Sequence, residues 1–191
     1  VVTGTSALTP TYTDFPIGGK GLSPAVAQGA SGEVIKDSFV IDFLGCHYGY
    51  CADSTRTFFI GPPPFDIRKT YVELNELLNK IKSLLVPGKT GEEIYDLAMK
   101  EIQQYSWKDR FMGYEQKVKF VGHGIGTEVN QFPVIAGKQK IPIENNMIIA
   151  LEPKIFLPDY GSIGIENSYL MSEGMAVSIT GNCENINDFI I

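Results

Sequence analysis

Two aspartates lie inside the strand-like segments of one predicted β-hairpin, and this feature constrains the fold most. Residues 39–59 have the sequence FVIDFLGCHYGYCADSTRTFF, which predicts two strands joined by a tight turn at residues 45–49. Asp42 interrupts the first apolar run, and Asp53 follows eleven residues later in the second strand. The hairpin can therefore fold the two side chains towards each other. Because buried carboxylates repel, such a pair needs a compensating cation, most simply a metal ion.

Composition limits the class of protein. The 191 residues are 43% hydrophobic, which is enough for a single domain with a sizeable core and no disulfides. The formal net charge of −6 argues against a partner that is a nucleic acid or an anionic membrane. We find neither a segment as long as a membrane span nor the pattern of a secretory signal, so we expect a soluble, cytoplasmic protein. The chain starts without methionine, and we expect a fragment or processed form of a longer protein.

The cysteines are odd in number and form no CxxC motif. Cys46 and Cys51 flank the predicted turn and could form a disulfide on oxidation, whereas Cys183 lies far away in the sequence. We favour free thiols in a reducing compartment over a disulfide.

The middle of the chain contains two predicted helices. From Asp66 to Val86 apolar residues recur at spacings of three and four, namely Tyr71, Leu74, Leu78, Ile81 and Leu85. Thr90 and Glu93 form a capping box that begins a second helix, with the apolar residues Ile94, Leu97, Ala98, Ile102 and Tyr105. We expect both helices to cover one face of a sheet. Residues 1–37 are rich in glycine, proline, serine and threonine, and are predicted to be mostly loop.

Three more polar residues lie in short apolar strands. His123 lies between two glycines in the predicted strand 118–125, which would let a ligand approach it closely. Glu152 lies in the strand 147–156, and Glu166 in the strand 162–171. Each residue alone has an ordinary alternative. The histidine could be structural or exposed, and the glutamates could be partly solvated or at a strand end.

Together these residues predict a metal site. Four carboxylates and one imidazole form a shell rich in oxygen ligands: Asp42, Asp53, His123, Glu152 and Glu166. Such a shell suits Mn, Fe, Co or Zn in a two-metal site better than a structural zinc site made of thiolates.

The motifs that carry these residues resemble a known family. DFLGCHYGYCADSTRT, GHGIG, ALEP and GIEN, in this order, are similar to the metal-ligand motifs of the pita-bread metallopeptidases. This family includes methionine aminopeptidase, Xaa-Pro aminopeptidase, prolidase and creatinase. The tyrosines, the glycine and the Thr-Arg-Thr run around Asp53 resemble the Xaa-Pro aminopeptidase and prolidase branch most. The resemblance extends from Val1 to about Thr180.

The resemblance implies an α+β fold. A curved antiparallel sheet backed by helices, with pseudo-two-fold symmetry, would form one catalytic domain over residues 1–191. That domain would be partial, because the family's N-terminal helices have no counterpart here. One sheet face could then lack cover, and we expect a second copy of the chain, as a homodimer, or the rest of the native protein to supply it.

The resemblance also implies a mechanism. Asp42 would chelate one of two divalent ions, Asp53 and Glu166 would bridge both, and His123 and Glu152 would bind the second. Glu152 would also help to move protons. The ions would be Mn, Co, Zn or Fe, about 3.5 to 4 Å apart, with a bridging hydroxide as the nucleophile. The substrate would be a short peptide that loses its N-terminal residue, with proline second.

Several positions depart from the family pattern. Asn130 replaces a second histidine that contacts substrate, so Asn130 is the candidate substrate-binding residue. The 20–33 loop has no histidine near Ala25 or Val26, and Gly164 replaces an arginine. These changes support an alternative function, a metal-binding pita-bread domain without peptidase activity that serves as a binding module. We expect the other histidine, His47, to be exposed at the hairpin turn.

Overall fold

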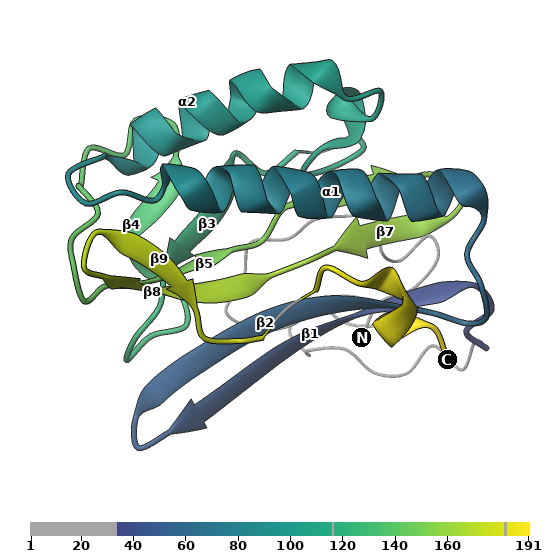
Figure 1. Ribbon diagram of the computed structural model, residues 1–191, viewed down its shortest axis with the longest axis horizontal. Coiled ribbons are helices and arrows are strands. Elements are labelled where there is room, and N and C mark those ends of the chain that lie inside the picture. The colour runs from purple at the N-terminus through teal and green to yellow at the C-terminus, as the bar shows by residue number, and fades with distance from the viewer. Residues whose placement is uncertain (1–33, 116, 182) are drawn as a thin grey trace.

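The fold has helices on one side and strands on the other (Figure 1). The structure, a computed structural model, describes residues 34–115, 117–181 and 183–191. The predicted loop over residues 1–33, including the positions without histidine at Ala25 and Val26, lies outside the described residues. Residues 34–37, which follow it, have no helix or strand, as predicted.

The predicted hairpin is confirmed. Strands β1 (Ser38–His47) and β2 (Tyr50–Phe59) pair antiparallel along their whole lengths. The turn is shorter than predicted, because β1 ends at His47 and β2 begins at Tyr50, which leaves only Tyr48 and Gly49 between them. These two residues have positive φ angles of 50° and 83°, as a tight two-residue hairpin turn requires. The hairpin is therefore a long, regular arm, and His47 at its end is exposed as predicted.

The two predicted helices are present with shifted ends. Helix α1 (Phe65–Leu84) turns the predicted apolar stripe inwards. None of the described helices is long and apolar enough to cross a membrane. Helix α2 (Gly91–Glu101) begins with the predicted capping box, in which Thr90 and Glu93 bond each other's backbone. It ends before the predicted Tyr105, since the chain tightens into the 3₁₀ turns η2 (Ile102–Gln104) and η3 (Lys108–Arg110).

Most remaining strands form one antiparallel sheet of five, in the order β4-β3-β5-β8-β9. Its members are β3 (Phe120–Gly124), β4 (Gln131–Ala136), β5 (Ile148–Leu151), β8 (Asn167–Ser172) and β9 (Met175–Ser178). A separate pair consists of β6 (Lys154–Leu157) and β7 (Gly161–Gly164), and a last 3₁₀ turn is η4 (Ile186–Phe189). The predicted α+β architecture, an antiparallel sheet backed by helices, is confirmed.

The structure corrects two strand predictions. The predicted strand 147–156 is divided into β5 and β6, and the predicted strand 162–171 into β7 and β8. Each division lies at a glutamate. Glu152 is followed by Pro153, which has no N–H to donate to a ladder, and the Glu166 N–H donates to the Thr55 carbonyl of β2. At each glutamate the chain therefore passes between the five-stranded sheet and the pair formed by β6 and β7.

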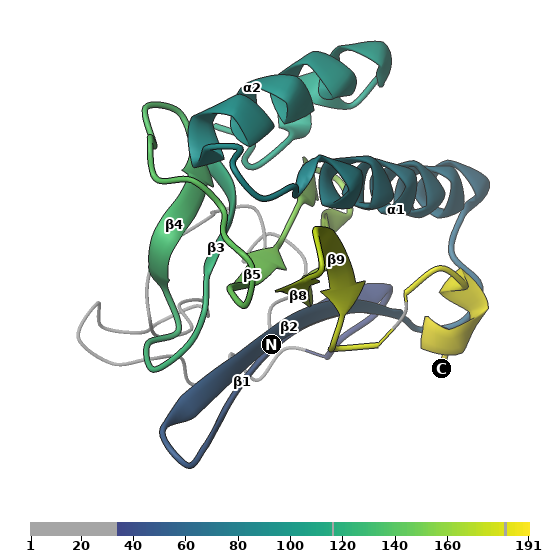
Figure 2. The ribbon, with the colours of Figure 1, turned by 60° about the vertical axis from the view of Figure 1, so that its left-hand side comes forward.

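The sheet lies between the helices and the hairpin (Figures 1 and 2). Helix α1 packs on β5 and β9, and α2 packs on β4, with a core of fully buried aliphatic residues such as Leu74, Leu77, Ile81, Ile149 and Met171. On the other side, β2 contacts β7 and β8. Apolar burial on the helix side holds the sheet rigid, and the polar side chains gather between the sheet and β2.

Candidate metal centre

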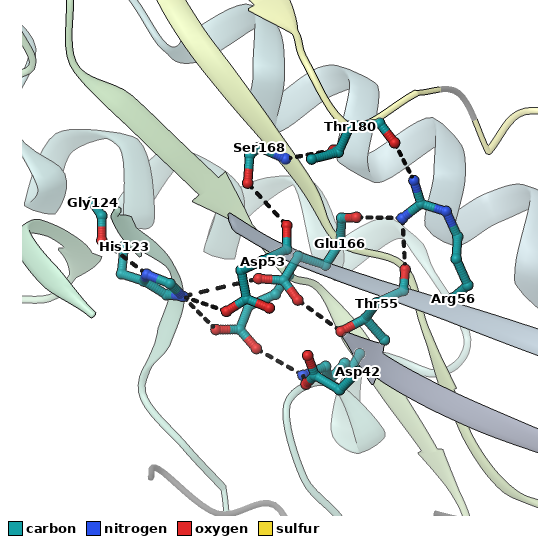
Figure 3. A network of polar contacts seen from close by, with 11 residues as sticks. Asp42, Asp53, Thr55, Arg56, His123, Gly124, Glu166, Ser168 and Thr180 are labelled. Carbon is teal, nitrogen blue, oxygen red and sulfur yellow. Dashed lines mark hydrogen bonds and ion pairs between the residues drawn. The ribbon is translucent and has the colours of Figure 1, made fainter. Parts of the chain in front are cut away.

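The structure brings the five predicted site residues into one cluster. Figure 3 shows Asp42, Asp53, His123 and Glu166 close by. Asp42 comes from β1, Asp53 from β2 and His123 from β3. Glu152 and Glu166 come from the two strand breaks. In the hairpin register Asp42 lies opposite Thr55, two residues from Asp53, so the two aspartates form a diagonal pair on one face, as predicted.

Asp53 points inwards because of the strict alternation along β2. Residues Asp53, Thr55, Thr57 and Phe59 are buried, and the residues between them are half-buried. Asp53 has only 6% of its surface exposed, and few other charged residues in the described part of the chain are buried. Its backbone carbonyl accepts a hydrogen bond from the Ser168 hydroxyl at 3.0 Å, which holds β2 against β8.

His123 is buried, with 1% of its surface exposed, so the alternative of an exposed histidine is wrong. Its Nδ1 lies 3.0 Å from the Gly124 carbonyl and donates to it, which leaves the lone pair of Nε2 facing the carboxylates. Nε2 lies 3.4 Å from Oε1 of Glu152, and 3.9 Å from both Oδ2 of Asp53 and Oε1 of Glu166. The ring is oriented as a metal-ligating histidine would be.

The glycines beside His123 also have a role in strand packing. A Cβ at Gly122 would lie 2.3 Å from the Ala150 carbonyl oxygen, and one at Gly124 would lie 2.6 Å from the Phe132 carbonyl oxygen. These glycines therefore let β5 and β4 approach β3 closely. They fix the histidine between its neighbouring strands, in addition to any room that they leave for a ligand.

Two buried carboxylate oxygens have no hydrogen-bond partner among the described residues. They are Oδ1 of Asp53 and Oε1 of Glu166. Buried polar atoms are almost always paired, so an orphaned pair needs a reason. Asp53, His123 and Glu166 each offer a ligand atom, and these atoms lie within 4.8 Å of one another. The set of donors fits a divalent ion such as Mn, Fe, Co or Zn. We call these three residues the His123 end of the cluster.

The electrostatics of the His123 end reflect charge crowding. Burial, together with the nearby Asp42 and Glu152 carboxylates, raises the pKa of Asp53 to about 7. Burial, followed by the charges of Glu152 and Asp53, also holds the pKa of Glu166 well above its usual range. Without a metal ion this end therefore retains protons that a cation would displace.

Glu152 is buried as well, which makes the alternative of a solvated strand end wrong. Burial alone would raise its pKa, but the Lys154 ammonium and the His123 ring outweigh burial and lower the pKa to about 2. The Lys154 Nζ lies 2.8 Å from Oε2 of Glu152. Glu152 is therefore an ionised carboxylate between two groups, with Oε1 towards His123 and Oε2 towards Lys154.

Asp42 is the least enclosed of the five, with 43% of its side chain exposed. Its Oδ2 lies 3.3 Å from the same Lys154 Nζ. We call Asp42, Lys154 and Oε2 of Glu152 the Asp42 end of the cluster. The sequence analysis missed Lys154, although a lysine inside the apolar run MIIALEPKIF is as anomalous as the glutamate before it.

Two further residues that sequence reasoning left without a role support Glu166. The Thr55 hydroxyl donates to Oε2 of Glu166 at 2.7 Å. The Arg56 guanidinium donates to the backbone carbonyls of Glu166 and Thr180 and to the Asn167 side chain, as Figure 3 shows in part. The Thr-Arg-Thr run was the available signal. Its alternation places the threonines inside, and the arginine clamps the strand break from the other face.

The predicted substrate residue Asn130 is half-buried and directly precedes β4, whose first residue Gln131 pairs with Gly124. Its backbone thus lies beside the glycine that follows His123. Gly164, the position of the missing arginine, pairs with Lys154 across β6 and β7. The role of Asn130 stays a prediction.

Residues 9–173 match Metallopeptidase family M24. The chain belongs to this family. The Xaa-Pro dipeptidase of Pyrococcus furiosus is 30% identical to the M24 chain over 144 residues, which are 75% of this chain and 40% of that protein. The crystal structure of the X-Pro aminopeptidase from Thermotoga maritima superposes with a TM-score of 0.75 at 27% identity, covering 87% of this chain and 45% of that one.

A third likeness concerns the fold alone. The N-terminal domain of FACT complex subunit SPT16 from Cicer arietinum superposes with a TM-score of 0.74 at 16% identity, covering 88% of this chain and 42% of that one. The M24 chain therefore spans less than half the length of these relatives. Its pita-bread fold and its family are established by these matches.

Proposed function

We propose that this M24 chain is the catalytic part of a dinuclear metal-dependent peptidase that releases the N-terminal residue of short peptides with proline second. The proposal is carried by two buried oxygens, one on Asp53 and one on Glu166, that have no hydrogen-bond partner in the described part of the chain and lie beside Nε2 of His123. Membership of family M24 supports the peptidase class. The relatives named Xaa-Pro dipeptidase and X-Pro aminopeptidase support the proline preference.

The chain offers ligands for two ions. Asp53, His123 and Glu166, with Oε1 of Glu152, would hold one, and Asp42 would hold the other together with the bridging carboxylates of Asp53 and Glu166. Ions bound there would polarise a peptide carbonyl and lower the pKa of a water molecule enough to supply hydroxide near neutral pH. The hydrogen bonds from Thr55 and Arg56 fix Glu166 in advance, so that its free oxygen is already oriented.

Proton movement falls to Glu152, which we propose as the catalytic carboxylate. While Lys154 and His123 flank it, its pKa of about 2 keeps it ionised but makes it a weak base. It would therefore take up a proton only when the contact with Lys154 is released. Asp53 has a pKa of about 7 when no cation is bound, and its proton must leave before it can act as a ligand. Near neutral pH and without a cation, Glu152 is thus ionised, whereas Asp53 is about half protonated.

The substrate side rests on Asn130. An amide side chain both donates and accepts hydrogen bonds but carries no charge or transferable proton. We propose that Asn130 binds the peptide backbone where the resemblance implies a histidine. We also propose a homodimer in a cytoplasmic setting, and sedimentation of the purified chain tests the dimer.

Metal content and peptidase activity, measured together, test the proposal. The chain is prepared with Mn, Co or Zn, metal per chain is quantified, and Xaa-Pro and Met-Ala peptides are assayed. Asp53→Asn removes one ligand, and Asp96→Asn, an exposed acid on α2, is the matched control. We expect about two ions per chain and Xaa-Pro cleavage that Asp53→Asn abolishes and Asp96→Asn preserves. A chain that binds no metal would contradict the mechanism.

The alternative is a binding module without peptidase activity. One observation favours it, because Lys154 already pairs with Asp42 and Glu152 and no metal is needed to neutralise that end. Bound metal without cleavage of any tested peptide, in a chain that stays folded, would select this alternative over the peptidase.

A further inference from the structure

Lys154 places a positive charge inside the carboxylate cluster. It begins β6, two residues after Glu152, and its side chain is 20% exposed. The Nζ lies 2.8 Å from Oε2 of Glu152 and 3.3 Å from Oδ2 of Asp42. Both carboxylates belong to the predicted metal ligands. The ammonium therefore already binds the Asp42 oxygen that a metal ion would use, and it holds Oε2 of Glu152, the oxygen that points away from His123.

The neighbouring strand leaves room for this lysine. Gly164 lies directly opposite Lys154 in the pairing of β6 and β7. A Cβ at Gly164 would lie 3.0 Å from Cγ and 3.5 Å from Cε of Lys154, and 3.4 Å from the Thr55 methyl. The lysine stem thus runs across the glycine towards the carboxylates. The position of Lys154 is therefore part of the strand packing, because the side chains of Lys154 and Thr55 fill the space that Gly164 leaves.

The two ends of the cluster consequently differ in whether the carboxylate oxygens already have a partner. At the His123 end, Oδ1 of Asp53 and Oε1 of Glu166 are buried without partners in the described residues. At the Asp42 end, Oδ2 of Asp42 and Oε2 of Glu152 already have a cation. A divalent ion and an ammonium repel strongly at the distance of shared ligands. An ion at the Asp42 end must therefore displace Lys154.

We propose that Lys154 is a built-in counter-ion that makes the two metal ions bind in order, the first at the His123 end and the second only after the ammonium leaves Asp42. This inference rests on the proposed dinuclear centre. Lys154 is a positioning residue, since it acts on the metal ligands and not on substrate. It sets how much free metal the chain needs to fill both sites.

The test is a titration of the 191-residue chain with Mn²⁺ alone, followed by native mass spectrometry and calorimetry. We expect a one-ion species that dominates over at least about a tenfold range of Mn²⁺ concentration before the second ion binds. Lys154→Met keeps the length of the side chain and removes its charge. It should tighten the second dissociation constant by about tenfold or more and leave the first within about threefold.

Two variants separate charge from structure. Lys154→Arg keeps the charge and should restore ordered binding, whereas a merely structural lysine would not be rescued in this way. Lys80→Met removes a lysine from an exposed ion pair with Glu101, far from the cluster, and should bind Mn²⁺ like the wild type. If Lys154→Met does not fold, the wild-type titration still decides, because one-ion dominance is required there.

Equal affinities for both ions in the wild type, or a second dissociation constant unchanged in Lys154→Met, would overturn the inference. Failure of the proposed function looks different. Ordered binding without cleavage of Xaa-Pro peptides would contradict the peptidase alone, whereas cleavage with two equivalent ions would contradict the order alone. A chain that binds no Mn²⁺ in either form would contradict both.

Discussion

The His123 end and the Asp42 end of the cluster each contain one aspartate and one glutamate but balance their charge differently. At the His123 end the carboxylates are buried and two of their oxygens lack partners among the described residues, so a bound cation or protons would neutralise their charge. At the Asp42 end the aspartate is 43% exposed on its side chain and pairs with Lys154. Burial thus makes a bound metal ion more favourable at the His123 end, whereas the Lys154 ammonium makes it less favourable at the Asp42 end.

The largest expected effect is the difference in Mn²⁺ affinity between two variants, each of which lacks one ligand at one end of the cluster. Glu166→Gln removes a charged ligand at the His123 end and should weaken binding of the first Mn²⁺ by at least about 100-fold. Asp42→Asn should leave the first ion within about threefold, because Lys154 occupies that end. Calorimetric titration of both chains measures this, with melting temperatures as the check of folding. Equal losses of the first ion in the two variants would remove the distinction between the ends.

The next effect is the pH dependence of stability without metal. Asp53 has a pKa of about 7 in the folded chain against an ordinary value of 3.8, and the pKa of Glu166 is raised in the same direction. Between these values the folded chain holds protons that the unfolded chain has lost, so stability falls as pH rises. We expect the free energy of unfolding to drop by roughly 2 kcal/mol or more from pH 5 to pH 7.5.

Added metal should reverse this trend, because ions bind the deprotonated carboxylates and stabilise the folded chain by mass action. Urea unfolding at both pH values, with chelator and with Mn²⁺, measures the change. Glu152 acts in the opposite direction only at lower pH, where its stabilising contribution is lost as pH falls towards 2. A metal-free chain that becomes more stable from pH 5 to pH 7.5 would contradict the charge crowding at the His123 end.

A smaller effect should follow from the groups that support the ligands. Thr55→Val removes the hydroxyl that donates to Oε2 of Glu166 and should weaken the first Mn²⁺ by about tenfold. Thr57→Val is the matched control, since Thr57 is equally buried on β2 but bonds the Gly164 backbone. It should cost stability, about 1 to 3 kcal/mol, without a comparable loss of metal. Equal metal losses in both variants would assign the effect to strand packing.

The smallest effect is expected at the far end of the hairpin. Cys46 and Cys51 face each other in the β1 and β2 register with their sulfurs 2.8 Å apart, and both are free thiols, as expected. A mild oxidant should join them without a shift in backbone register, while buried Cys183 stays reduced. We expect the first Mn²⁺ affinity to change by less than about threefold. Mass spectrometry of alkylated peptides detects the disulfide, and a larger affinity change would couple the hairpin end to the centre.

Local patterns predicted much of this molecule. The alternation along β2 predicts the inward face of Asp53, and the capping box at Thr90 predicts the start of α2, because both depend on neighbouring residues only. The convergence of five polar anomalies predicts the cluster. The division at Glu152 had a local signal in Pro153. The division at Glu166 was not predictable, since it depends on a hydrogen bond to Thr55 from a distant part of the chain.

Lys154 shows a different limit. Its sequence context resembles that of Glu152, an ionisable residue in an apolar strand, but an ammonium binds no cation, so Lys154 stands outside any metal-ligand pattern. Its role depends on the pairing with Gly164, because the lysine stem passes over a residue that has no side chain. A search for compensating charges of either sign, made together with the ligand search, would have found it.

The most direct test locates a single bound ion. Crystals of the chain grown with one equivalent of Mn²⁺ are measured at the manganese absorption edge. We predict one anomalous peak at the His123 end, among Asp53, His123 and Glu166, with Lys154 still bound to Asp42. A peak beside Asp42 with the lysine displaced, or equal peaks at both ends, would contradict the account.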